Sequence, residues 1–242
     1  MWTVLRKELK ELLRLHGSGK RTLLLTLLPL CGAGALFAVI WSKELLNSPA
    51  AAVLCVAVPM GMVVAVICDS FAGERERHTL ETLLSSRLPD SAILLGKIGA
   101  TMAFGWVLTL ELMGFMQVTV LIVKGAPESW SRVLAWHGGA LAVGLPLWGF
   151  WGSMGVLASL RAPTVKRAQQ TLGLVFLFVC LLPMLLAVSA GMRRRIEGAL
   201  GSLKGVNPGI ILAGVVLFLA LVDVVLMLIA MARFKRSKLI LD

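Results

Sequence analysis

Charged side chains are scarce in this sequence. Only 15% of its 242 residues are Asp, Glu, Lys or Arg, whereas soluble domains carry about 25%. Hydrophobic residues make up 58% of the chain, and the mean hydropathy is +0.88. A soluble globular enzyme is therefore excluded. Intrinsic disorder is excluded as well, because a chain this apolar does not stay solvated.

Cysteine is rare in this sequence, and the motifs of catalysis are missing. The four cysteines lie in or at the end of apolar runs, which excludes a disulfide scaffold. There is no H-E-x-x-H motif, and the three histidines lie far apart. The segment 17–22 superficially resembles a phosphate-binding loop, but the G-x-x-x-x-G-K-[ST] pattern places Arg14 and Arg21 at two of its required positions. We expect no catalytic residue, no metal site and no cofactor in this chain.

What the sequence does contain is a series of apolar runs. A helical membrane span needs about 20 mostly apolar residues, and lipid offers no partner for free backbone groups. Six segments meet this requirement: 22–41, 50–68, 98–123, 133–157, 171–190 and 208–232. The sequence therefore predicts an all-α, polytopic integral membrane protein with six transmembrane helices, in which residues 1–242 form a single domain.

Positive charge predicts the orientation of these spans. The net charge is +11, and most Lys and Arg residues fall in the N-terminal segment, the loops after the second and fourth spans, and the C-terminal tail. Both termini are therefore predicted to be cytoplasmic, in a bacterial cell membrane, with lipid rather than nucleic acid as the partner of the basic residues. Arg193–Arg195 do not fit, because they fall on the outside. They indicate either short external or re-entrant helices, or a misplaced fifth span.

Residues 1–21 predict an interfacial amphipathic helix before the first span. Its apolar stripe is formed by Trp2, Leu5, Leu9, Leu12 and Leu13, and Lys7, Lys10, Glu11 and Arg14 point away from that stripe. Such a helix can be a lever that joins a cytoplasmic partner to the first span, or a passive anchor, and the sequence does not separate the two.

The loop between the second and third spans is much longer than a connector requires. It begins with a charged cluster at 74–77, and Thr79 can cap a short helix whose apolar stripe comes from Leu80, Leu83 and Leu84. Pro89 ends this helix, and Asp90 or Ser91 can cap the next one. The loop is interpreted as a docking surface, or alternatively as a juxtamembrane helix that pairs only with itself and lipid.

Two stretches of this chain resemble the type 2 permeases of ABC transporters. The first is Gly73-Glu-Arg-Glu-Arg-His-Thr-Leu-Glu-Thr-Leu-Leu84, followed by Pro89 and Leu94-Leu-Gly-Lys97. The second is Leu5-Arg-Lys-Glu-Leu9, which is similar to the N-terminal interfacial helix of that family. Six spans with both ends inside agree with this resemblance.

The resemblance implies that 79–86 is a cytoplasmic coupling helix that docks on a separate ATPase subunit, with Gly73–Arg77 at its hinge. The implied docking residues are Gly73, Glu74, Arg75, Glu76, Arg77, Thr79, Leu80, Glu81, Leu83 and Leu84. Two ATPase subunits carrying Mg-ATP would drive a homodimer or heterodimer of permeases that exports a substrate. The alternative is an ATP-driven mechanotransmission or anchoring subunit that moves no solute.

Two carboxylates lie near the middle of predicted spans, Glu111 in the third and Asp223 in the sixth. A carboxylate facing lipid costs several kcal/mol, so both should face protein or water. They indicate either a translocation path or interhelical hydrogen bonds to Gln117, Ser153 or Thr119.

Overall fold

The computed structural model of the chain describes residues 19–41, 48–79, 85, 89–127, 129–188 and 207–234. Every regular element in these ranges is helical. The predicted interfacial helix, Arg193–Arg195 and most of the predicted coupling helix, including Leu80, Glu81, Leu83 and Leu84, lie outside the described residues.

Helices occupy all six predicted positions. They are α2 (Gly19–Ile40), α4 (Pro49–Ala57) with α5 (Met60–Cys68), α8 (Asp90–Lys124), α9 (Trp130–Arg161), α10 (Val165–Val188) and α12 (Pro208–Arg233). Four segments are long and apolar enough to cross a membrane: Ala51–Glu76, Asp90–Lys124, Trp130–Arg161 and Gly209–Arg233. The chain is therefore a multi-pass, all-helical membrane protein with at least these four candidate spans.

Several helices extend beyond the predicted spans. The second continues past Cys68 through a π-helical turn, η1 (Asp69–Gly73), into the short helix α6 (Glu74–Glu76). Helix α8 begins at Asp90, where the sequence predicts a helix that leads into the third span. Hydropathy marks only the apolar part of a helix, whereas the backbone stays helical as long as its polar side chains find partners. The residue that caps α8 is Pro89 with extended backbone, so the predicted capping by Asp90 or Ser91 is wrong.

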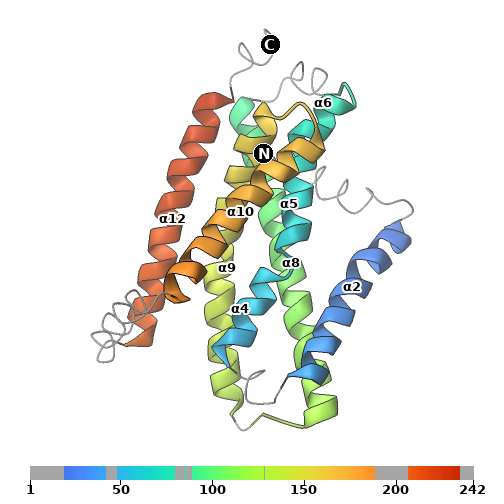
Figure 1. The fold of residues 1–242 in the computed structure, drawn as a ribbon, viewed down its shortest axis with the longest axis vertical. Helices are drawn as coiled ribbons and strands as arrows, with labels where there is room; N and C mark the ends of the chain where they lie inside the picture. Colours follow the sequence, from blue (N-terminus) through green and yellow to red (C-terminus); the bar gives the residue numbers. More distant parts are fainter. Residues whose placement is uncertain are drawn as a thin grey trace.

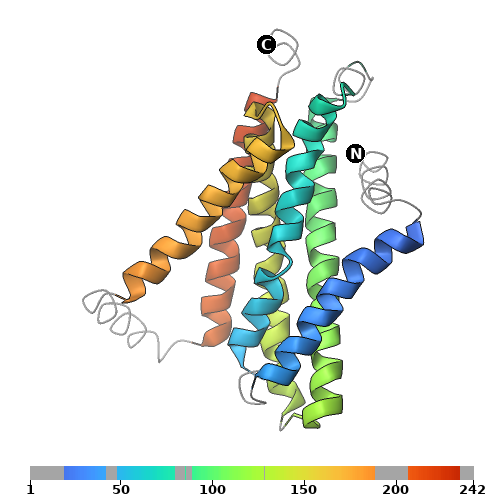
Figure 2. The same cartoon turned by 45° about the vertical axis from the view of Figure 1, so that its right-hand side comes forward.

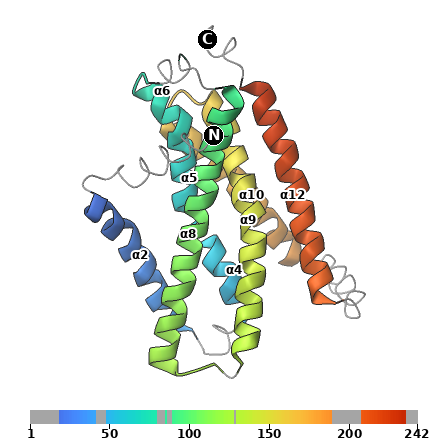
Figure 3. The ribbon, with the colours of Figure 1, turned by 180° about the vertical axis from the view of Figure 1, so that it is seen from behind.

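The long helices α8 and α9 form the centre of the bundle (Figure 1). Helix α2 packs on α8, and α12 packs on α9. Helices α2 and α12 therefore lie on opposite sides of the central α8–α9 pair. The α4–α5 pair contacts both central helices, as Figure 3 shows from behind. Helices α2 and α10 are inclined to the others (Figure 2). Pro59 separates α4 from α5, whereas α9 continues through Pro146.

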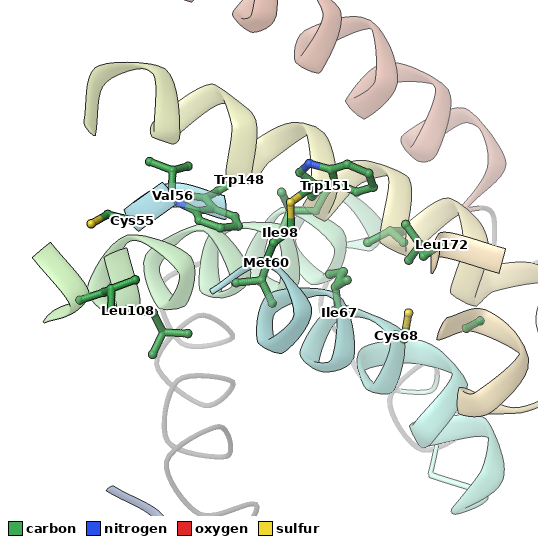
Figure 4. Packing of buried hydrophobic residues seen from close by; sticks show 14 of the residues in the cluster. Cys55, Val56, Met60, Ile67, Cys68, Ile98, Leu108, Trp148, Trp151 and Leu172 are labelled. Carbon is green, nitrogen blue, oxygen red and sulfur yellow. The ribbon is translucent and has the colours of Figure 1, made fainter. Parts of the chain in front are cut away.

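The core lies between α5, α8 and α9 and contains two fully buried indoles, Trp148 and Trp151 (Figure 4). Glycine makes this packing possible. A Cβ on Gly105 would lie 2.6 Å from the Trp148 ring, and one on Gly155 would collide with Ile67. The outer faces are apolar too, and the exposed residues of α12 include Ile210, Leu217, Phe218, Leu221, Val224, Val225 and Leu228. Such a surface suits lipid rather than water.

Helix α6 and the Arg233 end of α12 lie at one end of the bundle, and the Lys124 end of α8 and the Trp130 end of α9 lie at the opposite end (Figure 1). We call the first of these the α6 end. It contains the charged cluster that the sequence marks as functional.

Candidate functional site

The α6 end is organised around the buried cation of Lys97. The Lys97 side chain is 1% exposed, and its Nζ donates to Glu74 Oε1 at 2.9 Å and to the backbone oxygen of Ser70 at 2.7 Å. The same Nζ lies 5.0 Å from the centre of the Phe71 ring. A buried ammonium is tolerated only with such partners. Lys97 therefore ties α8 to both η1 and α6.

Ser70 lies in the π-helical turn η1, whose carbonyls accept from the residue five positions further along the chain rather than four. Lys97 reaches one of these carbonyls, and the Ser70 hydroxyl donates back to Ile67 at 2.7 Å. Phe71 is buried and packs on Phe234 after α12, with ring centres 5.3 Å apart. The turn thus brings the ends of α5, α8 and α12 together.

Arg75 and Glu76 bind the connection between α9 and α10. The two guanidinium nitrogens of Arg75 donate to the backbone oxygens of Leu160 and Ala162, both at 2.9 Å. Glu76 Oε1 accepts from the backbone N–H of Val165, also at 2.9 Å. Two adjacent side chains of α6 therefore hold the last turn of α9 and the first turn of α10.

Arg77 and Asp69 form the outermost pair of the cluster. Arg77 Nη2 lies 2.9 Å from Asp69 Oδ1, and the Arg77 side chain is 55% exposed. Both residues belong to the same short segment, so this pair joins no two separate helices. A Cβ at Gly73 would collide with the Asp69 carboxylate, and glycine leaves room for the pair.

His78 ends α6 and turns the chain toward the loop. Its φ of 56° is left-handed, its N–H donates to Arg75 O at 3.1 Å, and the N–H of Thr79 donates to Glu74 O at 2.9 Å. This is a Schellman arrangement, in which two carbonyls at a helix end gain partners. The Thr79 hydroxyl also donates to Glu74 O, at 3.2 Å, so its side chain closes the helix before it.

The structure therefore brings together Gly73–Arg77, Lys97 and residues 160–165. The sequence singled out the first group for docking, included Lys97 as a loop cation and as part of the permease-like stretch, and counted Arg161 only among the basic residues of the loop after the fourth span. The position of Lys97 in a helix that becomes apolar directly after it is the one sequence signal for its burial. Whether the loop docks on a partner stays a prediction.

Of the two intramembrane carboxylates, Asp223 joins α12 to α9. It is 8% exposed, and its Oδ1 accepts from the Ser153 hydroxyl at 3.0 Å. A Cβ at Gly149 would collide with its carboxylate, so a glycine of α9 allows the close approach. The interhelical hydrogen bond to Ser153, one of the two alternatives from the sequence, is present.

Glu111 lies elsewhere, half-buried on α8 near Cys31 of α2. Among the described residues, no hydrogen bond to its carboxylate is found. Gln117, considered as its partner, instead lies 3.2 Å from His137 Nε2, and His137 Nδ1 lies 2.8 Å from Val133 O. The tautomer with its proton on Nδ1 satisfies both contacts and joins α8 to α9.

Neither carboxylate belongs to a metal site in the part of the chain that the structure describes. No group of three or more His, Cys, Asp or Glu side chains there could hold an ion.

Residues 42–197 match a family model described as ABC-2 family transporter protein. A comparison with curated proteins found no match. The matched region contains α4 to α10 and the whole cluster at the α6 end.

Proposed function

The chain belongs to the ABC-2 family of transporter proteins, and from this premise we propose that it is the permease subunit of an ABC exporter. ATP would be hydrolysed by separate ATPase subunits, two per complex, and two permease chains would enclose the path. The family is a membrane transport component, and the chain lacks a phosphate-binding loop, so catalysis belongs to the partner.

Six spans and cytoplasmic termini complete this proposal. Helices α2 and α10 would be the first and fifth spans, beside the four candidate spans already described. The Arg233 end of α12 lies at the α6 end, together with Arg75, Lys97 and the Arg161 end of α9. The positive-inside rule would place this end in the cytoplasm.

The observation that carries the docking proposal is the fixed base of the loop at 77–89. Lys97, Arg75 and Glu76 fasten the segment before the loop to three helices. A docking element must not bend at its base if it is to pass on force. Apolar residues of the loop would be the anchor, as buried apolar side chains dominate many interfaces.

We expect Leu84→Asp to weaken binding of the ATPase subunit by about tenfold, because a charge would enter a desolvated contact. The chain would be co-expressed with a candidate Walker-type ATPase subunit, and the amount of ATPase that co-purifies would be measured. Ser91→Ala, at the exposed start of α8 and outside the proposed coupling helix, should leave the yield unchanged. The chain alone should hydrolyse no ATP. Equal recovery with Leu84→Asp, or turnover by the isolated chain, would contradict the proposal.

The two carboxylates are proposed to differ in role. Glu111→Gln should lower transport about fivefold or more without changing assembly, whereas Asp223→Asn should leave transport intact because Asn still accepts from Ser153. Uptake of rhodamine 6G, an amphiphilic probe, into inverted vesicles with the ATPase would be compared. Unchanged uptake by Glu111→Gln would remove Glu111 from the path. ATP hydrolysis with no uptake by the wild type would favour the mechanotransmission alternative.

A further inference from the structure

Adjacent residues of α6 bind the two opposite helix ends of one turn. Arg75 meets the carboxyl end of α9, and Glu76 meets the amino end of α10. Helix ends carry backbone groups without intrahelical partners, partly negative at the carboxyl end and partly positive at the amino end. Each charge therefore has the sign that its helix end favours.

The turn itself is short and leaves little slack. Helix α9 ends at Arg161 and α10 begins at Val165, with Thr164 accepting from the N–H of Arg167 at 3.3 Å. On the other side, α6 spans three residues before the Schellman bonds at His78 and Thr79 lead into the loop. Few rotatable backbone bonds separate the loop from the α9–α10 pair.

We propose that Arg75 and Glu76 are positioning residues that transmit movement of the docking loop to α9 and α10. The inference rests on the proposed function, since it needs an ATPase that moves the loop. Without these two side chains the loop would still bind the ATPase, but α10 would no longer follow it. Lys97 remains as the link to α8 in that case.

Two fluorescent reporters separate these events. Bimane would be attached to Ser85→Cys in the loop or to Gln170→Cys on the exposed face of α10, in the full complex with the ATPase in nanodiscs. In the wild type, ATP with vanadate should change both signals. In Arg75→Met/Glu76→Ala, we expect the response at 170 to fall about fivefold and the response at 85 to stay within about twofold.

Three further variants distinguish transmission from a loss of structure. Val165→Pro removes the N–H that Glu76 binds, at a helix position that proline favours. It should lower the response at 170 as much as Glu76→Ala does, and combining the two substitutions should lower that response no further. Glu76→Gln keeps the accepting oxygen and should retain the response at 170. Lys166→Gln removes an exposed cation from the first turn of α10 and leaves the bonds of Arg75 and Glu76 in place, so it should behave as the wild type.

The possible failures are distinct. A full response at 170 in both Arg75→Met/Glu76→Ala and Val165→Pro would overturn the linkage while leaving the proposed function intact. No response at 85 in the wild type, or no bound ATPase, would instead refute the proposed function. If the double variant loses its monodisperse elution profile, Val165→Pro and Glu76→Gln decide the outcome.

Discussion

Replacing Lys97 by methionine should destabilise the folded chain by about 3–5 kcal/mol, because the carboxylate of Glu74 would lose its buried partner. The carbonyl of Ser70 would lose a donor at the same time. In detergent, the midpoint of thermal unfolding should fall on the order of 10 °C. Fluorescence-detected size exclusion after heating measures this shift directly.

Two variants make the Lys97 result interpretable. Lys97→Met/Glu74→Leu removes both charges, and it should recover more than half of the lost stability, because apolar replacement of a buried pair is nearly neutral. Arg77→Gln removes a cation of the exposed pair in the same cluster and should cost less than about 1 kcal/mol. A loss for Lys97→Met no larger than that for Arg77→Gln would show that the ammonium is not structurally important.

Gly105→Ala should cost about 2–3 kcal/mol, since its Cβ would lie 2.6 Å from the ring of Trp148. That indole is fully buried, so it cannot swing into open space. The same thermal assay should show this loss of stability. Replacing a helical glycine by alanine normally has the opposite effect and raises stability by about 1 kcal/mol.

The matched control lies on the same helix. Gly114 is exposed, and a Cβ there would meet nothing within 4 Å, so Gly114→Ala should be neutral or stabilising. Trp148→Phe makes room for a methyl group, and the double variant with Gly105→Ala should cost less than the sum of the two single variants. Additive costs would mean that the two side chains do not meet as described.

Sequence reasoning placed the helices well because its signal is local. A run of about 20 apolar residues must be helical in lipid whatever surrounds it, and helices lie at all six expected positions. The loop after the second span was recognised from its own residues in the same way. The end of the second helix was less well predicted, because the polar side chains of Glu74, Arg75 and Glu76 find partners far away in the chain.

The sequence by itself determined that this chain is helical, lies in a membrane, and carries a charged cluster at the start of the loop after its second span. Only the tertiary structure decided what those charges hold. Arg75 and Glu76 bind backbone groups 85 to 89 residues away, and backbone partners leave no trace in side-chain patterns. The burial of Lys97 likewise depends on how α8 packs against η1, a contact between segments that hydropathy treats separately.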